Sequence, residues 1–298
     1  MPEINGKTRL CGIFGYPVGH SFSPAMHNSA FEHMSMNWAY VPFPVRPEDL
    51  GQAVSAVWAL NLAGVNVTVP HKQSVAALVD RLSDAARLSG AVNTIVNHGG
   101  VLAGHNTDGE GFTRALQEDA GMDARTGPAL VLGAGGAARA VAVALALSGS
   151  PAVFVANRSG GRAGELCELI MNSTGCRAAV LNWGETPRPG TLDYSGWAGV
   201  LSQVTLVVQT TPLGMHPKTG EAPPFPYELV NPGHVVVDLI YNPARTLFMQ
   251  RCEEFGARVF NGLGMLLHQG AIAFELWTGR TPPLEVMRDA LILAVGSK

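Results

Sequence analysis

The segment from Ala129 to Ala140 constrains the fold more than any other part of the sequence. It reads Ala-Leu-Val-Leu-Gly-Ala-Gly-Gly-Ala-Ala-Arg-Ala, a strand pattern that turns at glycines directly into a helix pattern. Gly133, Gly135 and Ala138 fit GxGxx(G/A), in which the glycines allow a tight turn and close approach of a pyrophosphate, and the small third residue lets the helix pack on the strand. This favours dinucleotide binding at the helix N-terminus over a glycine turn used only for packing. The predicted cofactor-binding residues here are Gly133, Ala134, Gly135, Gly136 and Ala137.

The residues after the next predicted strand indicate which dinucleotide binds. NAD sites usually carry Asp or Glu there, which accepts a hydrogen bond from the ribose 2′-hydroxyl. This chain instead has Asn157, Arg158 and Ser159, with Arg162 four residues beyond Arg158. Two guanidinium groups and a hydroxyl suit a 2′-phosphate. The sequence therefore favours NADP over NAD, and over the alternative that both arginines are solvated residues opening the next helix.

Short β-rich runs alternate with stretches of helical spacing along the chain, which is typical of a parallel α/β fold. The predicted strands are 11–14, 38–42, 63–69, 129–132, 152–156, 206–209 and 235–238. The predicted helices are 24–34, 47–60, 75–87, 109–120, 247–255 and 265–278, and a Pro- and Gly-rich surface loop is expected from Thr186 to Gly196. The length of 298 residues fits two domains. A first boundary is predicted near 106–111, where an Asn-Thr-Asp-Gly turn precedes the helix that leads to the glycine-rich turn.

Composition and charge exclude several classes of protein. The chain is 47% hydrophobic and 14% charged, so it can bury a large core and is not expected to be disordered. Its net charge of −3, without a basic cluster, makes nucleic acid an unsuitable partner. The apolar stretch 129–147 contains Arg139 and three glycines, so a buried strand and helix explain it better than a membrane span.

The cysteines and the N-terminus indicate a reducing, cytoplasmic location. Four cysteines lie far apart and form no CxxC pair, so neither a disulfide framework nor a zinc ribbon is expected: Cys11, Cys167, Cys176 and Cys252. The first seven residues lack the apolar run of a signal peptide. No HExxH or Cys/His spacing supports a metal site, and none is predicted.

Four polar motifs lie upstream of the boundary, each after a predicted strand or before a predicted helix. They are Gly-Tyr-Pro-Val-Gly-His-Ser-Phe-Ser-Pro (15–24), Asn-Val-Thr-Val-Pro-His-Lys (66–72), Gly-Ala-Val-Asn-Thr (90–94) and Gly-His-Asn-Thr-Asp-Gly (104–109). In an α/β domain such loops converge at the carboxyl ends of strands, where ligands bind. Their hydroxyl, amide, ammonium and carboxylate groups would suit a small, oxygen-rich, anionic substrate.

These motifs, in this order, resemble the shikimate dehydrogenase family from about Gly12 to Gly279. The resemblance also covers the glycine-rich turn, Asn157-Arg158 and three later segments: Thr-Pro-Leu-Gly-Met (211–215), Asp-Leu-Ile-Tyr-Asn-Pro (238–243) and Asn-Gly-Leu-Gly-Met (261–265), followed by Gln269. It implies an N-terminal α/β substrate-binding domain plus a Rossmann-type, doubly wound NADP-binding domain, with the C-terminal helices returning to the substrate domain. The implied domains are residues 1–107 with 262–298, and residues 108–261.

The resemblance implies reversible hydride transfer between NADPH and 3-dehydroshikimate, giving shikimate, in aromatic amino-acid biosynthesis. Lys72 and Asp108 would form the catalytic pair. Hydride arriving at a ketone carbon leaves an alkoxide, and a Lys beside a carboxylate can supply and position the proton that it needs. Asp108 would also accept a hydrogen bond from a ring hydroxyl.

The other roles are carried over by motif. The implied substrate-binding residues, besides the catalytic pair, are Ser21 and Ser23 for the carboxylate, Thr68 and Asn93 for ring hydroxyls, and Tyr241 and Gln269 closing the pocket. The implied cofactor-binding residues beyond the glycine-rich turn are Asn157, Arg158, Ser159, Arg162, Thr211, Gly264 and Met265. The expected partners are NADP and a small-molecule substrate, without nucleic acid or membrane, in a monomer or homodimer.

Taken singly, these residues also have ordinary structural explanations. Ser21 and Ser23 could be cap or turn residues, Lys72 a solvated surface lysine and Asp108 the cap of the following helix. Two departures from the family pattern are Gln209, where relatives often carry Asn, and Asn261, where many carry Asp.

Two other functions stay open. One is a quinate/shikimate or aminoshikimate dehydrogenase of the same superfamily. The paired Ser21 and Ser23, together with Arg158, favour the biosynthetic enzyme over this alternative. The other is a non-catalytic NADP-binding module that senses redox state. The presence of both Lys72 and Asp108 disfavours it, because nucleotide sensing does not need them.

Overall fold

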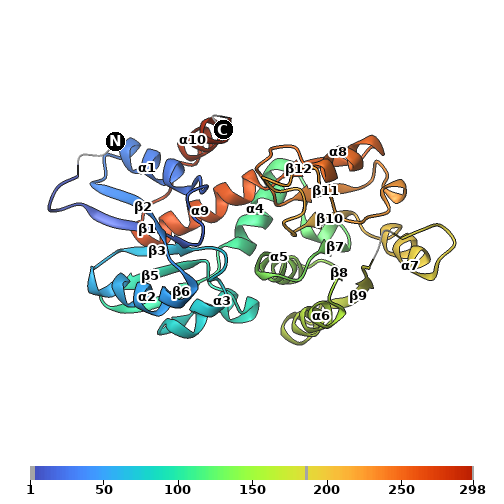
Figure 1. Ribbon diagram of the computed structural model, residues 1–298, viewed down its shortest axis with the longest axis horizontal. Coiled ribbons are helices and arrows are strands. Elements are labelled where there is room, and N and C mark those ends of the chain that lie inside the picture. The colour runs from blue at the N-terminus through green and yellow to red at the C-terminus, as the bar shows by residue number, and fades with distance from the viewer. Residues whose placement is uncertain (1–3, 185–186, 297–298) are drawn as a thin grey trace. The chain divides into compact units, whose positions relative to one another are not determined.

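The chain forms two compact units, which a computed structural model describes over residues 4–184 and 187–296. Unit 1 comprises residues 1–111 and 266–298, and unit 2 comprises residues 112–265. The chain enters unit 2 within α4 (Asp108–Ala120) and returns within α9 (Leu263–Thr278), as the colours of Figure 1 show. The domain limits predicted from the sequence, 1–107 with 262–298 and 108–261, stay predictions.

Unit 1 is built on a six-stranded mixed sheet in the order β2-β1-β3-β5-β6-β4. Its strands are β1 (Arg9–Gly15), β2 (Trp38–Pro44), β3 (Gly64–Val67), β4 (Arg81–Leu82), β5 (Thr94–His98) and β6 (Val101–His105). β5 pairs antiparallel with both β3 and β6. The two glycines between β5 and β6 have positive φ and close a two-residue hairpin. The α/β class is confirmed, but the expectation of purely parallel strands is wrong for this sheet.

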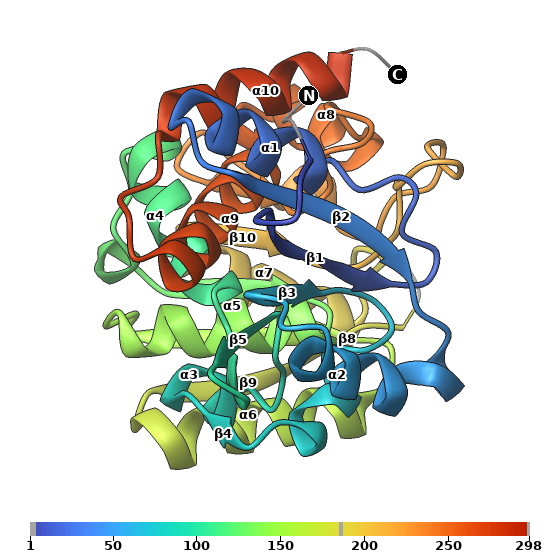
Figure 2. The same ribbon diagram turned by 90° about the vertical axis from the view of Figure 1, so that its left-hand side faces the viewer.

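Helices cover both faces of the sheet in unit 1. They are α1 (Ser23–His33), α2 (Leu50–Ala59), α3 (Asp84–Ser89), α10 (Leu284–Gly296) and the unit 1 part of α9, with short 3₁₀ turns at η1 (Pro47–Asp49) and η2 (Ser74–Leu78). An aliphatic core that includes Val54, Val57 and Ala86 lies between the sheet and α2 and α3. On the other face, an aromatic cluster joins α1, β2 and α9, and Figure 2 shows α1 and α10 on that side.

The predicted helix 75–87 is wrong, because a polar side chain diverts the backbone. The Asp80 backbone N–H donates to the carbonyl of Leu102 (2.9 Å), and its Oδ2 accepts from the Leu102 N–H (2.7 Å). These bonds tie the segment to β6 and make the short strand β4 possible. A helix starts only after Ser83, whose hydroxyl caps α3, and it ends at Gly90 in the left-handed conformation.

Unit 2 is a doubly wound parallel sheet in the order β12-β11-β10-β7-β8-β9, which confirms the predicted Rossmann-type fold. Its strands are β7 (Ala129–Leu132), β8 (Ala152–Asn157), β9 (Arg177–Asn182), β10 (Leu206–Gln209), β11 (Val235–Asp238) and β12 (Arg258–Asn261). Its helices are α5 (Gly136–Leu147), α6 (Gly160–Thr174), α7 (Leu192–Leu201) and α8 (Leu247–Glu254), with 3₁₀ turns η3 (Ala124–Thr126) and η4 (Tyr227–Leu229).

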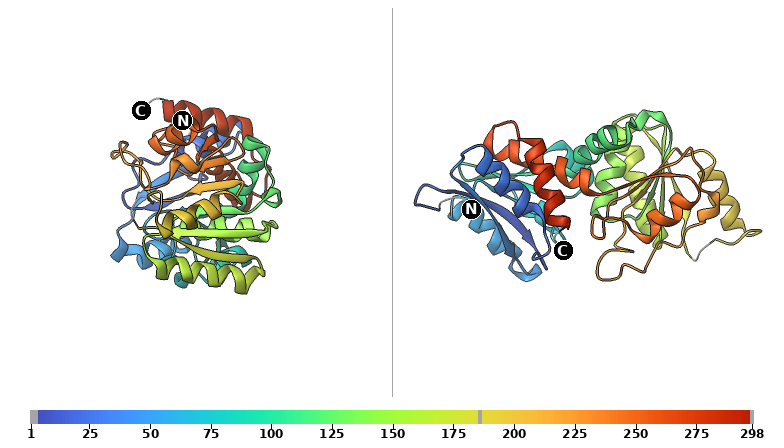
Figure 3. Two further views of the ribbon diagram at one scale, coloured as in Figure 1. Left: turned by 90° about the vertical axis from the view of Figure 1, so that its right-hand side faces the viewer. Right: turned by 90° about the horizontal axis from the view of Figure 1, so that it is seen from above.

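A large core fixes α7 and α8 on one face of this sheet. Trp197 of α7 and Phe248 of α8 are fully buried against β-strand residues such as Leu130 and Val236. In the right-hand view of Figure 3 the orange helix α8 lies on one side of the sheet and the green helix α5 on the other. The main strands here are predictable because parallel strands buried on both faces read as continuous apolar runs.

The loop predicted from Thr186 to Gly196 is only partly correct. Thr186 lies outside the described residues, whereas 192–196 form the first half of α7, which Thr191 caps by accepting a hydrogen bond from the Tyr194 N–H (3.2 Å). No helix in the described part of the chain is long and apolar enough to span a membrane.

Candidate active site

Lys72 and Asp108 form an ion pair in unit 1. Lys72 Nζ lies 2.6 Å from Asp108 Oδ2, and the two side chains are 20% and 5% exposed. Lys72 lies in the loop after β3, where its carbonyl accepts from the Val92 N–H (2.7 Å). Asp108 begins α4, and its own N–H donates to Oδ1 of Asn106 (3.1 Å). The fold therefore brings the two predicted catalytic residues together from loops that are distant in sequence.

Asn93 holds the second oxygen of the Asp108 carboxylate. Its Nδ2 donates to Asp108 Oδ1 (2.9 Å), to Thr107 Oγ1 (2.9 Å) and, at longer range, to Gln269 Oε1 (3.3 Å). Its Oδ1 accepts from the Thr107 N–H (2.8 Å). Four predicted site residues thus lie in one buried polar cluster, made of Lys72, Asn93, Asp108 and Gln269.

A glycine allows α4 to approach α9 closely at this cluster. A Cβ at Gly111 would lie 2.6 Å from the backbone nitrogen of Gln269. The Thr107 hydroxyl also donates to the carbonyl of Gln269 (3.0 Å). Because any larger residue at 111 would push the helices apart, Gly111 places the Gln269 side chain beside Asn93.

Ser21 and Thr68 lie in the loops after β1 and β3, which are neighbours in the sheet, and Ser23 is the first residue of α1. The hydroxyl of Ser21 accepts from the Ser23 N–H (3.3 Å), and Thr68 is half-buried with its N–H donating to the carbonyl of Phe14 (2.9 Å). Tyr241 belongs to unit 2, where it is half-buried after β11. Contact of these four side chains with a substrate stays a prediction.

The glycine-rich turn of unit 2 leaves room for a phosphate. Gly133 has φ +119° and a Cβ there would collide with the Thr210 hydroxyl, so only glycine fits. Ala138 is fully buried, as close helix-to-strand packing requires. Gly135 and Gly136, at the start of α5, have open space where a Cβ would project. A helix N-terminus with this clearance fits a pyrophosphate, so the turn passes the geometric test for a dinucleotide.

Two exposed cations follow β8 at the predicted 2′-phosphate position. Arg158 and Arg162 are both exposed, and neither has an ion-pair partner within residues 4–184 and 187–296. Ser159 caps α6 by accepting from the Arg162 N–H (3.4 Å), and Asn157 Nδ2 donates to the carbonyl of Ser159 (3.0 Å). Asn157 and Ser159 therefore shape the loop, and the two guanidinium groups can turn to an anion.

Gln209 shapes the loop that carries Thr211. Its Oε1 accepts from the Thr211 N–H, and its Nε2 donates to the carbonyls of Thr211 (3.0 Å) and Leu213 (3.2 Å). The side chain is fully buried. Gln209, one of the two departures from the family pattern, therefore holds the 211–213 loop in place within unit 2.

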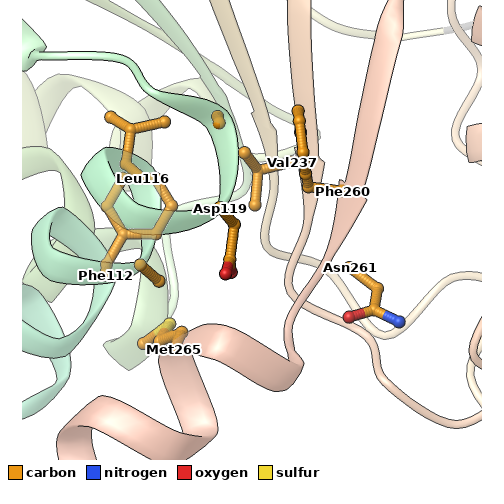
Figure 4. A pocket seen from close by; sticks show the side chains of 9 residues that line it. Phe112, Leu116, Asp119, Val237, Phe260, Asn261 and Met265 are labelled. Carbon is orange, nitrogen blue, oxygen red and sulfur yellow. The ribbon is translucent and has the colours of Figure 1, made fainter.

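Gly264 and Met265 begin α9 beside a small void in unit 2. The void measures about 10 Å³, room for one water, and Asn261, Asp119 and Met265 are among its lining residues (Figure 4). In Figure 4 the Asp119 carboxylate points to the first turn of α9, and a Cβ at Gly264 would collide with it. Gly264 therefore has a packing reason to be glycine, and its role and that of Met265 in cofactor binding stay predictions.

Three polar side chains that hydrogen-bond to Asn93 were not predicted from the sequence. Thr107, Thr94 and Asn66 all make buried hydrogen bonds to Asn93. The only signal was their presence in the motifs 66–72, 90–94 and 104–109. Within the described residues no group of three or more His, Cys, Asp or Glu side chains is placed to hold a metal ion.

Comparison with known proteins agrees with this geometry. The family model "Shikimate dehydrogenase substrate binding domain" matches residues 13–95, and the model "Shikimate 5'-dehydrogenase C-terminal domain" matches residues 262–292. A shikimate dehydrogenase (NADP(+)) of Desulforamulus reducens is 53% identical over 289 residues, covering 97% of this chain and 96% of the relative.

Two solved structures are similar over nearly the whole chain. A shikimate dehydrogenase in complex with NADP+ is 37% identical with a TM-score of 0.88, covering 99% of this chain and 98% of that one. Shikimate 5-dehydrogenase of Thermus thermophilus, in complex with NADP(H) and shikimate, is 37% identical with a TM-score of 0.83, covering 96% and 99%. The chain therefore belongs to the shikimate dehydrogenase family.

Proposed function

We propose that this protein is an NADP-dependent shikimate dehydrogenase, which reversibly reduces 3-dehydroshikimate to shikimate with NADPH in aromatic amino-acid biosynthesis. The observation that carries the proposal is the Lys72–Asp108 pair, held in a buried polar cluster by a chain of the shikimate dehydrogenase family. The similar structures were solved with NADP+ and with NADP(H) and shikimate, and the site residues of this chain suit the same two ligands.

The residues of this chain donate and accept one proton during the reaction. NADPH, when bound, supplies the hydride that reaches the ketone carbon. The ketone oxygen then needs a proton, which Nζ of Lys72 donates; in the reverse direction Nζ takes it back. Asp108 keeps the ammonium group in place through Oδ2, while Asn93 holds Oδ1. The pair therefore works as a general acid and its positioning carboxylate.

The remaining polar residues of unit 1 would bind the substrate. Ser21 and Ser23 offer hydroxyls to the carboxylate, and Thr68, Asn93 and Gln269 offer hydrogen bonds to ring hydroxyls. Tyr241 of unit 2 is proposed to close the pocket.

The cofactor would be held by unit 2. The pyrophosphate suits the first turn of α5 at 133–137, and Arg158 with Arg162 suits the 2′-phosphate that distinguishes NADP from NAD. Thr211, Gly264 and Met265 are proposed on the nicotinamide side, with Asn157 and Ser159 shaping the loop after β8.

A quinate-using enzyme is the second candidate, because a quinate dehydrogenase of Corynebacterium glutamicum solved with NAD is 30% identical to this chain with a TM-score of 0.85. The exposed Arg158 and Arg162 favour the NADP-dependent reaction with shikimate. A purely sensing module is disfavoured, since nucleotide sensing has no use for the Lys72–Asp108 pair.

The test is to offer shikimate and quinate, each with NADP and with NAD, and to measure the four kcat/KM values by absorbance of the reduced nicotinamide. The highest value is expected for shikimate with NADP. Comparable quinate activity or a preference for NAD would assign the protein to the second candidate. No activity in any arm, with NADP still bound, would leave the sensing module. A cytoplasmic location and a monomer or homodimer stay predictions.

A further inference from the structure

A continuous chain of buried hydrogen bonds leads from Tyr40, on the edge strand β2, to Asp108. The Tyr40 hydroxyl donates to Asn66 Oδ1 (2.8 Å), and Asn66 Nδ2 donates to Thr94 Oγ1 (3.0 Å). The Thr94 hydroxyl donates to Asn93 Oδ1 (3.2 Å), whose Nδ2 reaches the carboxylate of Asp108 (2.9 Å). All five side chains are buried. We call Tyr40, Asn66 and Thr94 the outer relay.

Two backbone groups fix the direction of every hydrogen bond in this chain. The Thr107 N–H can only donate, so the Asn93 atom that faces it is Oδ1, and Nδ2 faces the carboxylate. The carbonyl of Asn93 can only accept, so the Asn66 atom beside it (3.2 Å) is Nδ2, and Oδ1 faces Tyr40. The Tyr40 hydroxyl must then donate, and the Thr94 hydroxyl must accept from Asn66 and donate to Asn93. All donors therefore point toward the carboxylate.

The Tyr40 ring packs against two neighbouring rings on this face of the sheet. The His27 ring stacks on it, with centroids 4.5 Å apart and planes 11° apart, and the Trp277 ring lies 6.0 Å away. Burial lowers the pKa of His27 to about 3, so the imidazole ring that stacks on Tyr40 is uncharged at neutral pH. Burial also raises the pKa of Tyr40 well above its usual value, so the hydroxyl keeps its proton and remains a donor.

The sheet register brings the relay together from three strands. Tyr40 lies opposite Cys11 of β1, Asn66 opposite Ile13 of β1, and Asn66 opposite Thr94 of β5. These side chains share the sheet face covered by α1 and α9, so the long Tyr40 side chain can reach across β1 to β3. A buried polar row on an otherwise apolar face is costly unless every member is bonded, as these are.

We propose that the outer relay positions the proton-transfer pair by holding the Asn93 amide with Nδ2 toward Asp108. This rests on the proposed function. Oδ1 of Asp108 is then occupied by Asn93, and Oδ2 is left for Lys72. If the relay is broken, Oδ1 of Asn93 loses the Thr94 hydroxyl as a donor and only Thr107 still holds the amide, so Nδ2 is held less firmly against the carboxylate. The pair would then lose the alignment that proton transfer needs.

Removal of single hydroxyl groups tests the relay. Tyr40→Phe keeps the stacked ring, and Thr94→Val keeps the shape of the side chain; each should lower kcat for shikimate oxidation about tenfold and leave KM for NADP unchanged. Thr94→Ser restores the hydroxyl and should restore kcat. Tyr227→Phe is the matched control, because it removes the hydroxyl of a half-buried ring that donates to the carbonyl of Pro223 in unit 2 (2.9 Å), and its kcat should equal that of the unaltered protein.

The double variant separates a linked chain from two independent perturbations. Because Tyr40 acts through Thr94, Tyr40→Phe combined with Thr94→Val should be no slower than Thr94→Val alone, whereas independent effects would multiply to about a hundredfold loss. Multiplying effects, or an unchanged kcat in both single variants, would overturn the relay while the protein's own shikimate activity still stands.

A crystal structure of the Thr94→Val protein gives a readout that needs no activity. The separation of Lys72 Nζ and Asp108 Oδ2, 2.6 Å here, should increase beyond hydrogen-bond distance. An unchanged separation would refute the relay even if the protein failed to oxidise shikimate, a failure that would instead contradict the proposed function.

Discussion

Lys72 performs its proposed chemistry at one atom, Nζ, so its removal should affect turnover and not cofactor binding. Lys72→Ala is expected to lower kcat by about 10²–10⁴-fold, the range for loss of a general acid. The dissociation constant for NADP, measured by fluorescence titration, should change less than twofold, because the glycine-rich turn belongs to unit 2. Lys218→Ala removes an exposed lysine of unit 2 and is the control. Unchanged turnover in Lys72→Ala would exclude this residue from the mechanism.

Arg158 is expected to determine cofactor choice through a single charge-assisted contact. Loss of a guanidinium–phosphate hydrogen bond costs about 1.5–3 kcal/mol, so Arg158→Ala should raise KM for NADP roughly 10- to 100-fold. KM for NAD, which has no 2′-phosphate, should stay within twofold. Arg177→Ala, an exposed arginine on the edge strand β9, should alter neither constant. Equal changes for both cofactors would mean that Arg158 does not read the 2′-phosphate.

The junction of β11 and α8 depends on a buried carboxyl group, and this makes unit 2 sensitive to pH. Asp238 is fully buried at the end of β11, where it accepts hydrogen bonds from the Thr246 hydroxyl (2.6 Å) and the Ile240 N–H (3.0 Å). Burial raises its pKa from 3.8 to about 6 despite these bonds. The folded protein therefore holds this proton more tightly than the unfolded chain does. The stability that results is fully present below about pH 4 and is lost as the pH rises through 6, a change of about 3 kcal/mol.

Asp238→Asn should remove that pH dependence. The free energy of unfolding of the unaltered protein minus that of Asp238→Asn should fall by about 2 kcal/mol between pH 4.5 and pH 7.5, because all other groups cancel in the difference and the rest of the change lies below pH 4.5. Urea unfolding at several pH values measures it. A difference that stays constant over this range would show that Asp238 titrates normally.

At the level of elements, hydrophobic periodicity predicted strands and helices that depend on local sequence. It did not predict segments whose structure depends on hydrogen bonds to residues distant in sequence. The predictions of unit 2 strands such as 129–132 and 206–209 were correct, because both faces of these strands are buried and their sequences are therefore continuous apolar runs. The segment 75–87 has helical spacing, yet the Asp80 side chain bonds Leu102, which is distant in sequence, and no local pattern reports that contact. The resemblance to the family implied Lys72 and Asp108 as a pair. No local pattern indicated the relay that contacts them, because it exists only in the register of β2, β1, β3 and β5.

NADP and shikimate are proposed to bind to different units of the whole molecule, and this can be measured without a catalytic assay. A ligand at 100 times its dissociation constant stabilises the unit that binds it by about 2.7 kcal/mol. NADP alone should therefore slow amide hydrogen exchange at 133–137 and 157–162 of unit 2. Shikimate alone should slow exchange at 66–72, 91–94 and 105–108 of unit 1, where the buried cluster around Asn93 is already ordered by its own hydrogen bonds. Protection of unit 1 by NADP alone, to the extent that shikimate protects it, would contradict the division of binding between the two units.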